Sequence, residues 1–412
     1  RSTQAKTLFP YTTLFRSGYA DWTNAVITNT YATGNVTGTT NTGGLVGLLY
    51  YYADILSSTA FGNVQGASSV GGLLGQAVGT NTITDTKANG WVSGTSRVGG
   101  LVGDVSNSST TITNSVANNA VTGSYVNAGS TVYFGVKGSG ALVGGLVGYL
   151  NNSSITGSTA NTVVISQSTD VGGLVGRTES SASITTSGSM GTVTGTGNVG
   201  GLVGSMYSYS SVSNSYANSN ASSTGNTVGG FVGYFTTTGS ITNSRASGSA
   251  SGASYVGGFI GYMTNSGGVS TSYATGQVSA SGSYAGGFIG IVQDNYTRTL
   301  ENFYATGAVS GVGYADLGTQ IFDVVFNATS ASLTAELPPL SATAFAPGCL
   351  AYELAYGKGL TPFLKLASQA GVTRMADGVG MLAEQAAEAF EWWRGVRPDT
   401  AAVIRQLTVP LV

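Results

Sequence analysis

Short alternations of small apolar and variable residues, each followed by a glycine-rich pentapeptide, recur along most of the chain. In the first clear copy, residues 29–38, the small apolar residues are Ala32 and Val36, with Gly34 between them. Small residues at i, i+2 and i+4 with variable residues between them have the period of a strand that buries one face. A helix is excluded, because Gly costs about 1 kcal/mol in a helix interior and nearly every copy carries several. The pattern therefore predicts short strands around a narrow interior.

The alternating element occurs ten times, and the pentapeptide Gly-Gly-(Leu/Phe)-(Val/Leu/Ile)-Gly occurs nine times at intervals of 28 or 29 residues, with one interval of 45. The first small position holds Ala32, Ala60, Ala88, Ala117, Ala160, Ser189, Ala217, Ala246, Ala274 and Ala305. The second holds Val36, Val64, Val92, Val121, Val164, Val193, Ala221, Ala250, Val278 and Val309. One repeat cannot bury its own face, so stability accumulates as repeats stack. We predict an all-β fold, a parallel β-helix (β-solenoid) of about ten coils.

The repeats resemble a known family. The Gly-Gly-Leu-Val-Gly core that begins at Gly43, preceded by Tyr31-Ala32-Thr33-Gly34-x-Val36-x-Gly38, is similar to the GLUG repeat of large bacterial surface proteins, including filamentous-haemagglutinin-like adhesins. The resemblance covers about residues 24–320. It implies a parallel β-helix and export to the cell surface, but no defined ligand.

Composition narrows the expected chemistry. Only 8% of the residues are charged, the net charge is −2, and there is no basic patch of the size that nucleic acid requires. The chain has no His and a single Cys, Cys349, which removes the commonest general base, the commonest metal ligand and any internal disulfide. The sequence contains no apolar run of 18 or more residues, which is the length needed to span a membrane. We therefore expect no nucleic-acid partner, no membrane span, no cofactor and no metal.

Parallel β-helices include polysaccharide-cleaving enzymes, which need clustered carboxylates. No two acids recur at one register in adjacent repeats. Asp104 stands at a position occupied by unrelated residues in other copies, which indicates an exposed, unconstrained site, and Asp170 and Arg177 flank the fifth pentapeptide. The sequence therefore predicts no catalytic residues and no enzymatic activity.

Two segments depart from the repeat within residues 1–320. Residues 1–17 look like a non-native leader of the kind produced by translated adapter sequence. An insertion of 17 residues between Val121 and Gly144 supplies a possible binding loop, because insertions in solenoids emerge on one face. Its candidate binding residues are Tyr125, Tyr133, Phe134 and Lys137. The alternative is an extra hairpin without a binding role.

The predicted solenoid domain comprises residues 18–320. The repeat pattern ends there, and the rest of the chain has a different composition. Residues 321–365 look irregular, with Pro347-Gly348 as one interruption, and are predicted to close the solenoid. Residues 366–412 are predicted to be helical, with one helix at 381–394 and a second, capped near Asp399, that ends at Leu407.

These observations together predict a secreted or cell-surface adhesin segment, part of a larger polypeptide, that presents a long repeat-built face to glycans or proteins of a host or neighbouring cell. The alternative is a non-catalytic spacer or carbohydrate-active region of a larger surface enzyme. A cleft with two carboxylates in mutual reach would favour the enzyme.

Overall fold

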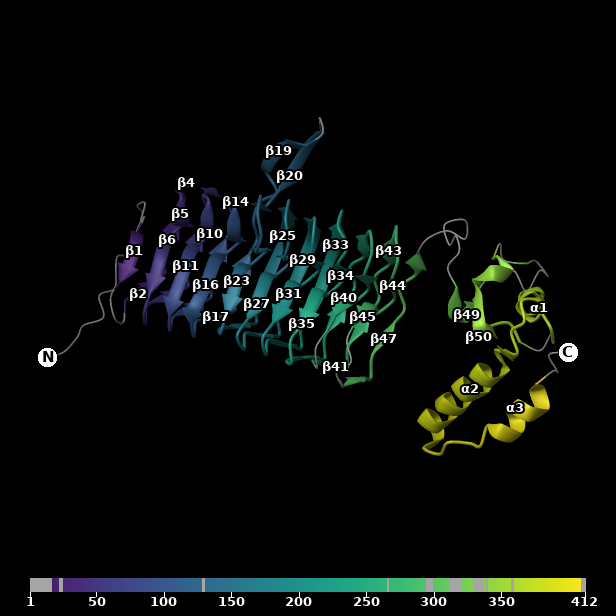
Figure 1. Ribbon diagram of the computed structural model, residues 1–412. Helices are drawn as coiled ribbons and strands as arrows, with labels where there is room; N and C mark the ends of the chain where they lie inside the picture. Colours follow the sequence, from purple (N-terminus) through teal and green to yellow (C-terminus); the bar gives the residue numbers. More distant parts are fainter. Residues whose placement is uncertain are drawn as a thin grey trace. The chain divides into compact units, whose positions relative to one another are not determined.

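The computed structural model describes residues 17–21, 25–127, 130–264, 267–293, 299–310, 321–328, 337, 340–356 and 359–408. The chain divides into two compact units, unit 1 (Arg1–Gly311) and unit 2 (Val312–Val412). Unit 1 is the stack of coils in Figure 1, drawn from purple to green, and unit 2 holds the helices. The predicted leader, residues 1–17, lies outside the described residues except for Ser17, which begins β1 (Ser17–Asp21).

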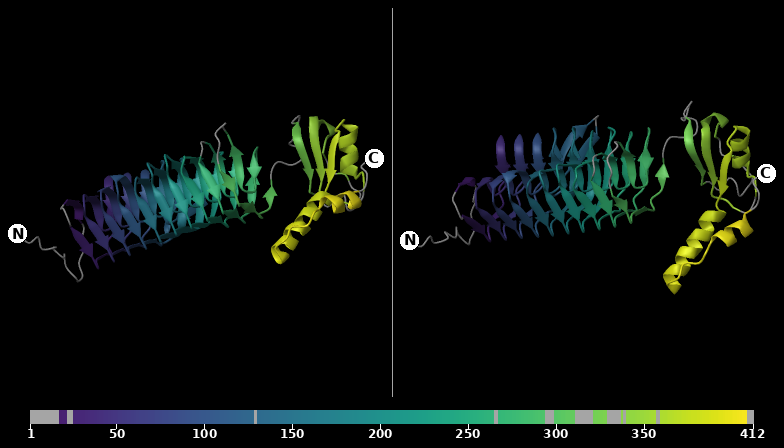
Figure 2. Two further views of the ribbon diagram at one scale, coloured as in Figure 1. Left: turned by 90° about the horizontal axis from the view of Figure 1, so that it is seen from below. Right: turned by 60° about the horizontal axis from the view of Figure 1, so that its bottom comes forward.

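Unit 1 is a stack of parallel coils, which follow one another from left to right in Figure 1, and each coil contributes short strands to the sheets that run along the stack. The coil after the first pentapeptide contains β7 (Asp54–Leu56), β8 (Thr59–Ala60), β9 (Val64–Gln65), β10 (Ser68–Gly71) and β11 (Leu74–Gly79). One ten-stranded sheet runs from β1 to β45 (Ile289–Val292), another from β2 (Val26–Thr28) to β46 (Leu300–Glu301), and a nine-stranded sheet from β5 (Thr40–Gly43) to β44 (Ala285–Gly286). A further sheet carries the alternating elements, from β3 (Tyr31–Ala32) to β48 (Val309–Ser310). The predicted solenoid is therefore confirmed (Figures 1 and 2).

The column of small residues points inward as predicted. Ala88 pairs with Ala60 on one side and with Ala117 on the other, and all three side chains are fully buried. Ala274 is also fully buried, whereas Ala305 in the last coil is exposed. Residues of successive repeats therefore lie side by side, one coil per repeat.

One member of the valine column was assigned wrongly. Val121 is 43% exposed, and its place between Val92 and Val164 is taken by Val136. The insertion begins before the second small position of this repeat, so the chain leaves the coil and returns at an equivalent valine. The interior is preserved because a residue of the same shape resumes the column.

Two apolar columns fill the solenoid. The larger contains the third residue of each pentapeptide, which changes from Leu to Phe along the stack: Leu45, Leu73, Leu101, Leu146, Leu174, Leu202, Phe231, Phe259 and Phe288. The three phenylalanine rings stack with centroids 4.5 and 4.7 Å apart. The smaller column consists of valines and alanines, including Val64, Val92 and Val136. The larger column therefore combines leucine and phenylalanine with the alanines of the alternating element, whereas the smaller column contains only valine and alanine.

A column of buried hydroxyl groups runs beside the apolar columns. Ser115 Oγ accepts a hydrogen bond from Thr86 N at 3.2 Å and donates one to Thr113 O at 2.9 Å. The same pair of bonds recurs at Ser158, Ser187, Ser215, Ser244 and Ser272. Because buried polar groups are costly without partners, this repetition satisfies backbone amides at the corner between two sheets.

The insertion forms an extra antiparallel hairpin, β19 (Gly123–Asn127) and β20 (Ser130–Phe134), before β21 (Val136–Gly138) rejoins the coil. Figure 1 shows this hairpin standing out from the side of the stack. The insertion therefore has the hairpin structure of the alternative prediction, and its binding role stays a prediction.

Unit 2 is built on a parallel sheet in the order β49 (Phe322–Asn327), β50 (Phe345–Glu353) and β51 (Arg374–Asp377). A 3-10 turn, η3 (Ala342–Ala344), precedes β50, and three helices follow it: α1 (Pro362–Gln369), α2 (Val379–Arg394) and α3 (Ala401–Leu407). The two predicted helices are confirmed as α2 and α3. The expectation that 321–365 is irregular is wrong, because β49, β50 and the start of α1 lie in it.

A separate core joins α1 to one face of this sheet. Cys349 and Ala351 of β50 pack with Phe363, Leu364 and Ala367 of α1. Val325 and Met375 of the neighbouring strands contact the same cluster. The predicted role of 321–365 in closing the solenoid stays a prediction.

Candidate functional site at the carboxyl edge of the unit 2 sheet

Three polar residues end the three parallel strands of unit 2. Asn327 of β49 pairs with Glu353 of β50, which pairs in turn with Asp377 of β51. In open α/β sheets, ligands bind outside the carboxyl ends of the strands. The row Asn327, Glu353 and Asp377 is therefore the candidate functional edge of unit 2.

Glu353 is a fully buried carboxylate held by its surroundings. Oε2 accepts hydrogen bonds from Asn327 Nδ2 at 2.9 Å and from Thr361 Oγ1 at 3.0 Å, and Oε1 accepts one from the backbone N of Ala355 at 3.1 Å. Thr361 is also the N-cap of α1 and accepts from Leu364 N at 3.3 Å. A single carboxylate thus ties together two strand ends, the following loop and the start of a helix.

Asp377 connects the same edge to α2. Its Oδ1 accepts from Val379 N at 3.2 Å, so the carboxylate lies at the N-terminus of a 16-residue helix, where negative charge is favoured. The sequence signal for this edge was available: apolar runs that each end in a polar residue, at Asn327, Glu353 and Asp377. Sequence reasoning missed it because the strands themselves were not recognised.

An arginine in the loop between α2 and α3 pairs with acidic residues of α2. Arg397 contacts the carboxylates of Glu384 at 2.8 Å, Glu388 at 2.5 Å and Glu391 at 3.0 Å, and these acids raise its pKa. Thr400, the N-cap residue of α3, donates to Glu384. Because these groups are solvent-exposed, the cluster orients the helices more than it stabilises them.

Cys349 takes no part in the candidate edge. The thiol is buried beneath α1, and burial raises its pKa above the ordinary range. A protonated thiol in an apolar core is a poor nucleophile and a poor metal ligand.

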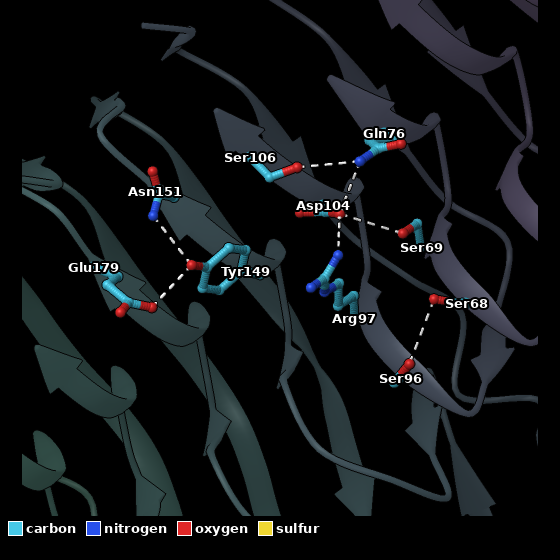
Figure 3. Close-up of polar contacts among 10 residues, drawn as sticks. All are labelled: Ser68, Ser69, Gln76, Ser96, Arg97, Asp104, Ser106, Tyr149, Asn151 and Glu179. Carbon is cyan, nitrogen blue, oxygen red and sulfur yellow. Dashed lines mark hydrogen bonds and ion pairs between the residues drawn. The ribbon is translucent and has the colours of Figure 1, made fainter. Parts of the chain in front are cut away.

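The solenoid carries a second polar cluster, around Asp104 of β16 (Val102–Ser108) (Figure 3). Asp104 Oδ2 accepts from Arg97 at 2.8 Å, Gln76 at 3.0 Å and Ser69 at 3.3 Å, whereas Oδ1 has no hydrogen-bond partner in the described part of the chain. The expectation that Asp104 is exposed is wrong, since its side chain is fully buried while that of Arg97 is 41% exposed. Burial raises the pKa of Asp104, outweighing Arg97 and the hydrogen bonds, which lower it.

This pKa shift predicts a pH dependence of stability. Because folding raises the pKa of Asp104, the folded state favours the protonated acid, and the resulting stabilisation is present below the pKa of the unfolded chain. It is lost as the pH rises through the higher, folded-state pKa. We expect the free energy of unfolding of the parent, relative to Asp104→Asn, to fall as the pH rises from about 4 towards 7. Urea titrations of both proteins across this range measure it, and a difference that stays flat or rises contradicts it.

A second buried acid repeats the arrangement with the charges exchanged. Asp170 and Arg177 stand seven residues apart, as do Arg97 and Asp104, but in the reverse order. Asp170 Oδ2 accepts from Arg177 Nε at 2.8 Å, and Oδ1 accepts from Ser205 at 2.6 Å. Each acid is paired with its own arginine, which indicates structural ion pairs and not a pair of catalytic carboxylates.

The four residues predicted to form a binding loop lie in different environments. Phe134 is buried beside Trp91, and Lys137 Nζ lies 4.0 Å from the centre of the Tyr125 ring. Tyr133 is 57% exposed, on the hairpin face away from these contacts. A binding role for the loop stays a prediction, with Tyr133 as its most exposed candidate.

Across the described ranges, no group of three or more His, Cys, Asp or Glu side chains is placed to hold a metal ion. No helix within those ranges has the length and apolar character to cross a bilayer.

Two family models match the chain, one in each unit. The GLUG motif matches residues 224–251, which supports the resemblance of the repeats at the level of the motif. The shikimate 5′-dehydrogenase C-terminal domain matches residues 378–408, from the N-cap of α2 to the C-cap of α3.

Curated relatives point to the same enzyme. Shikimate dehydrogenase (NADP(+)) of Nitrosospira multiformis is 56% identical over 105 residues, which are 26% of this chain and 38% of the relative. The enzyme of the same name from Dechloromonas aromatica is 50% identical over 119 residues, 29% of this chain and 43% of the relative. A solved structure of an Ael1 enzyme from Pseudomonas putida is 63% identical over 27% of this chain and 39% of its own, with a TM-score of 0.24. The chain spans about two fifths of the curated relatives that it matches.

These relatives correct the functional prediction. The expectation of an adhesin without enzymatic character is wrong, because the matched proteins are dehydrogenases. The predicted haemagglutinin-like character and the predicted glycan or cell-surface partners are contradicted by the same finding. Export to the cell surface stays a prediction. The matched length of 105 residues is close to that of unit 2, and the dehydrogenase family model lies inside unit 2.

Proposed function

We propose that unit 2 is the C-terminal part of a dehydrogenase that acts on shikimate with NADP(+). The observation that carries this proposal is the 56% identity over 105 residues to an enzyme of that name. The parallel sheet of unit 2 supports it, since its three strands end together in a polar row at the edge where α/β enzymes bind ligands.

The start of α2 resembles a dinucleotide-binding turn in sequence but not in its surroundings. Gly378-Val379-Gly380 followed by Ala383 has the spacing of a dinucleotide-binding turn and lies between β51 and α2. The Asp377 carboxylate, however, already accepts from Val379 N, and its charge opposes a phosphate at this helix N-terminus. A Cβ on Gly378 would lie 2.3 Å from Leu354 O, so close packing accounts for this glycine.

These residues therefore do not fit the pyrophosphate of NADP. In the proposal, the dinucleotide is bound by the part of the dehydrogenase outside the matched stretch. Unit 2 contributes a rigid carboxyl edge, fixed by the contacts of Glu353 and Asp377, and the helices that follow it.

A domain exchange tests the proposal. The matching C-terminal stretch of the Nitrosospira multiformis enzyme is replaced by residues 312–412, and oxidation of shikimate with NADP(+) is followed by the absorbance of NADPH. We expect kcat/KM within about tenfold of the parent enzyme, a loss of no more than about 1.4 kcal/mol in transition-state stabilisation.

The enzyme truncated before the exchanged stretch gives the baseline. A hybrid that unfolds near the temperature of the parent enzyme but does not oxidise shikimate contradicts the proposal. A hybrid that oxidises shikimate no faster than the truncated enzyme also contradicts the proposal.

A further inference from the structure

One sheet of the solenoid carries two ranks of hydroxyl groups on its outer surface. Its strands are three residues long, and the middle residue, such as Ile83, Ile112 or Ile155, is fully buried in the larger apolar column. The two residues that flank it point outward. Every outward residue is Thr or Ser in six successive coils: β12 (Thr82–Thr84), β17 (Thr111–Thr113), β24 (Ser154–Thr156), β28 (Ser183–Thr185), β32 (Ser211–Ser213) and β36 (Ser240–Thr242). We call these twelve side chains the hydroxyl array. Asp54 and Leu56 bound it at one end, and Gly268 bounds it at the other.

The hydroxyl array is regular in two directions. Thr82 pairs with Thr111 and Thr84 with Thr113, and the same in-register pairing continues through each later coil. Neighbouring coils therefore place their hydroxyl groups about 4.8 Å apart, and the two ranks, two residues apart along each strand, are separated by about 6.6 Å. Figure 2 shows the strands of the stack following one another in a straight row.

The hydroxyl groups of the array are accessible. Each of the twelve residues is exposed or half-buried. In the described part of the chain, Thr185 Oγ1 and Ser213 Oγ lie 3.4 Å apart and form the one hydrogen bond between side chains of the array. Because β-branched Thr has a restricted χ1 angle, its hydroxyl and methyl groups hold their positions. The array therefore presents a fixed grid of hydrogen-bonding and methyl groups.

The coil itself does not require hydroxyl groups at equivalent places on every sheet. The corresponding row of the neighbouring sheet changes in size and charge from coil to coil: Gln76, Asp104, Tyr149, Arg177, Ser205 and Tyr234. A surface that served solubility alone would tolerate the same variety, and charged residues would suit it better. The uniform array therefore indicates a ligand that is itself periodic.

Crystalline water is such a ligand. The oxygen atoms of ice repeat in two directions with spacings close to those of the array, so hydroxyl groups can occupy lattice positions while the methyl groups of Thr fill the gaps between them. Many weak contacts on a rigid, preorganised surface add up to firm attachment. We propose that the hydroxyl array binds the surface of ice crystals, a function of unit 1 that does not rest on the dehydrogenase function proposed for unit 2.

The growth of ice in the presence of the full chain tests the proposal. Thermal hysteresis, the gap between the melting and freezing points of a seeded crystal, is measured in a nanolitre osmometer. We expect a hysteresis that rises with protein concentration. Thr156 is exposed and lies between Thr113 and Thr185 in the middle of the array. Thr156→Lys should lower the hysteresis at least about twofold, because a long charged side chain at the centre holds the ice away from both ranks.

The matched control is Thr236→Lys, the same change at a half-buried threonine of β35 (Val232–Thr236), which belongs to the neighbouring sheet. This variant should behave like the parent. A gain of function guards against variants that fail to fold. The combined variant Ser154→Thr, Ser183→Thr and Ser211→Thr adds a methyl group in three successive coils of the first rank, so its hysteresis should exceed that of the parent. Circular dichroism shows whether each variant keeps the β structure of the parent.

Several results would overturn the proposal. One is a folded parent chain that causes no hysteresis and is excluded from growing ice. Others are a Thr156→Lys variant that matches the parent, a Thr236→Lys variant that loses as much as Thr156→Lys, and a folded triple-threonine variant whose hysteresis does not rise. The dehydrogenase hybrid contains no solenoid, so its turnover and the hysteresis of the full chain test the two proposals separately.

Discussion

Phe259→Ala should lower the free energy of unfolding of the solenoid by about 4 kcal/mol. The ring is fully buried and is stacked between Phe231 at 4.5 Å and Phe288 at 4.7 Å. The coils cannot collapse around the vacated space, because backbone hydrogen bonds of Phe259 to Phe231 and Phe288 hold the stack in register. Urea unfolding of the full chain, followed by circular dichroism, measures the loss.

Phe303→Ala is the matched control. Phe303 stacks on Phe288 at 4.4 Å but is 39% exposed, at the last coil. We expect this variant to lose less than about 2 kcal/mol, because less apolar area returns to water and little cavity remains. Equal losses for the two variants would show that stacking, and not enclosure within the coil, sets the stability.

Glu353→Ala should lower the stability of unit 2 by about 3 kcal/mol. The change removes the acceptor for Asn327, Thr361 and the backbone N of Ala355, two of which are buried side chains. It also separates the cap of α1 from the end of β50. Hydrogen exchange of peptides from residues 345–377, measured by mass spectrometry, reports the loss locally.

A conservative variant separates the contribution of side-chain volume from that of the hydrogen-bond acceptors. Glu353→Gln keeps the volume and one acceptor oxygen, so we expect a loss of about 1–2 kcal/mol. If the alanine variant protects the amides of 345–377 as well as the parent does, Glu353 does not organise the edge. The solenoid peptides serve as the internal reference in the same spectra.

The repeats made unit 1 readable from sequence. Ten aligned copies separate a fixed position, such as that of Ala88, from variable ones, and within the stack most of the fixed positions proved to be inward, whereas Ala305 in the last coil is exposed. The same averaging failed where one copy departs from the others. Val121 was assigned to the valine column because it stands four residues after Ala117, as in the other copies. The residue that fills this place in the interior is Val136.

Asp104 shows a different limit of the alignment. Variation at its position suggested exposure, but the positions two before and five after the first glycine of the pentapeptide face one another, so Arg97 and Asp104 can bury a pair there. Residue identity at one position depends on the residue opposite. A column examined alone cannot reveal that dependence.

The sequence of unit 2 contains no repeats that could be aligned with one another. Its helices were predicted because α2 is amphipathic over four turns, but β50 was not, since Pro347 and Gly348 lie inside it. The register between β49 and β50 shifts near these residues, and Gly348 has a φ of 79°, so an irregularity accommodates both. The polar edge followed from strands that the sequence alone did not reveal.

The uniform spacing of the coils has a consequence for how such a chain changes over generations. Each coil offers its neighbour the same backbone partners, as Val171, Val199 and Val228 do in three successive coils. Loss or duplication of one whole unit in the gene therefore leaves every junction equivalent to one that already existed. The number of coils can therefore change from one generation to the next, while the structure of each coil stays the same.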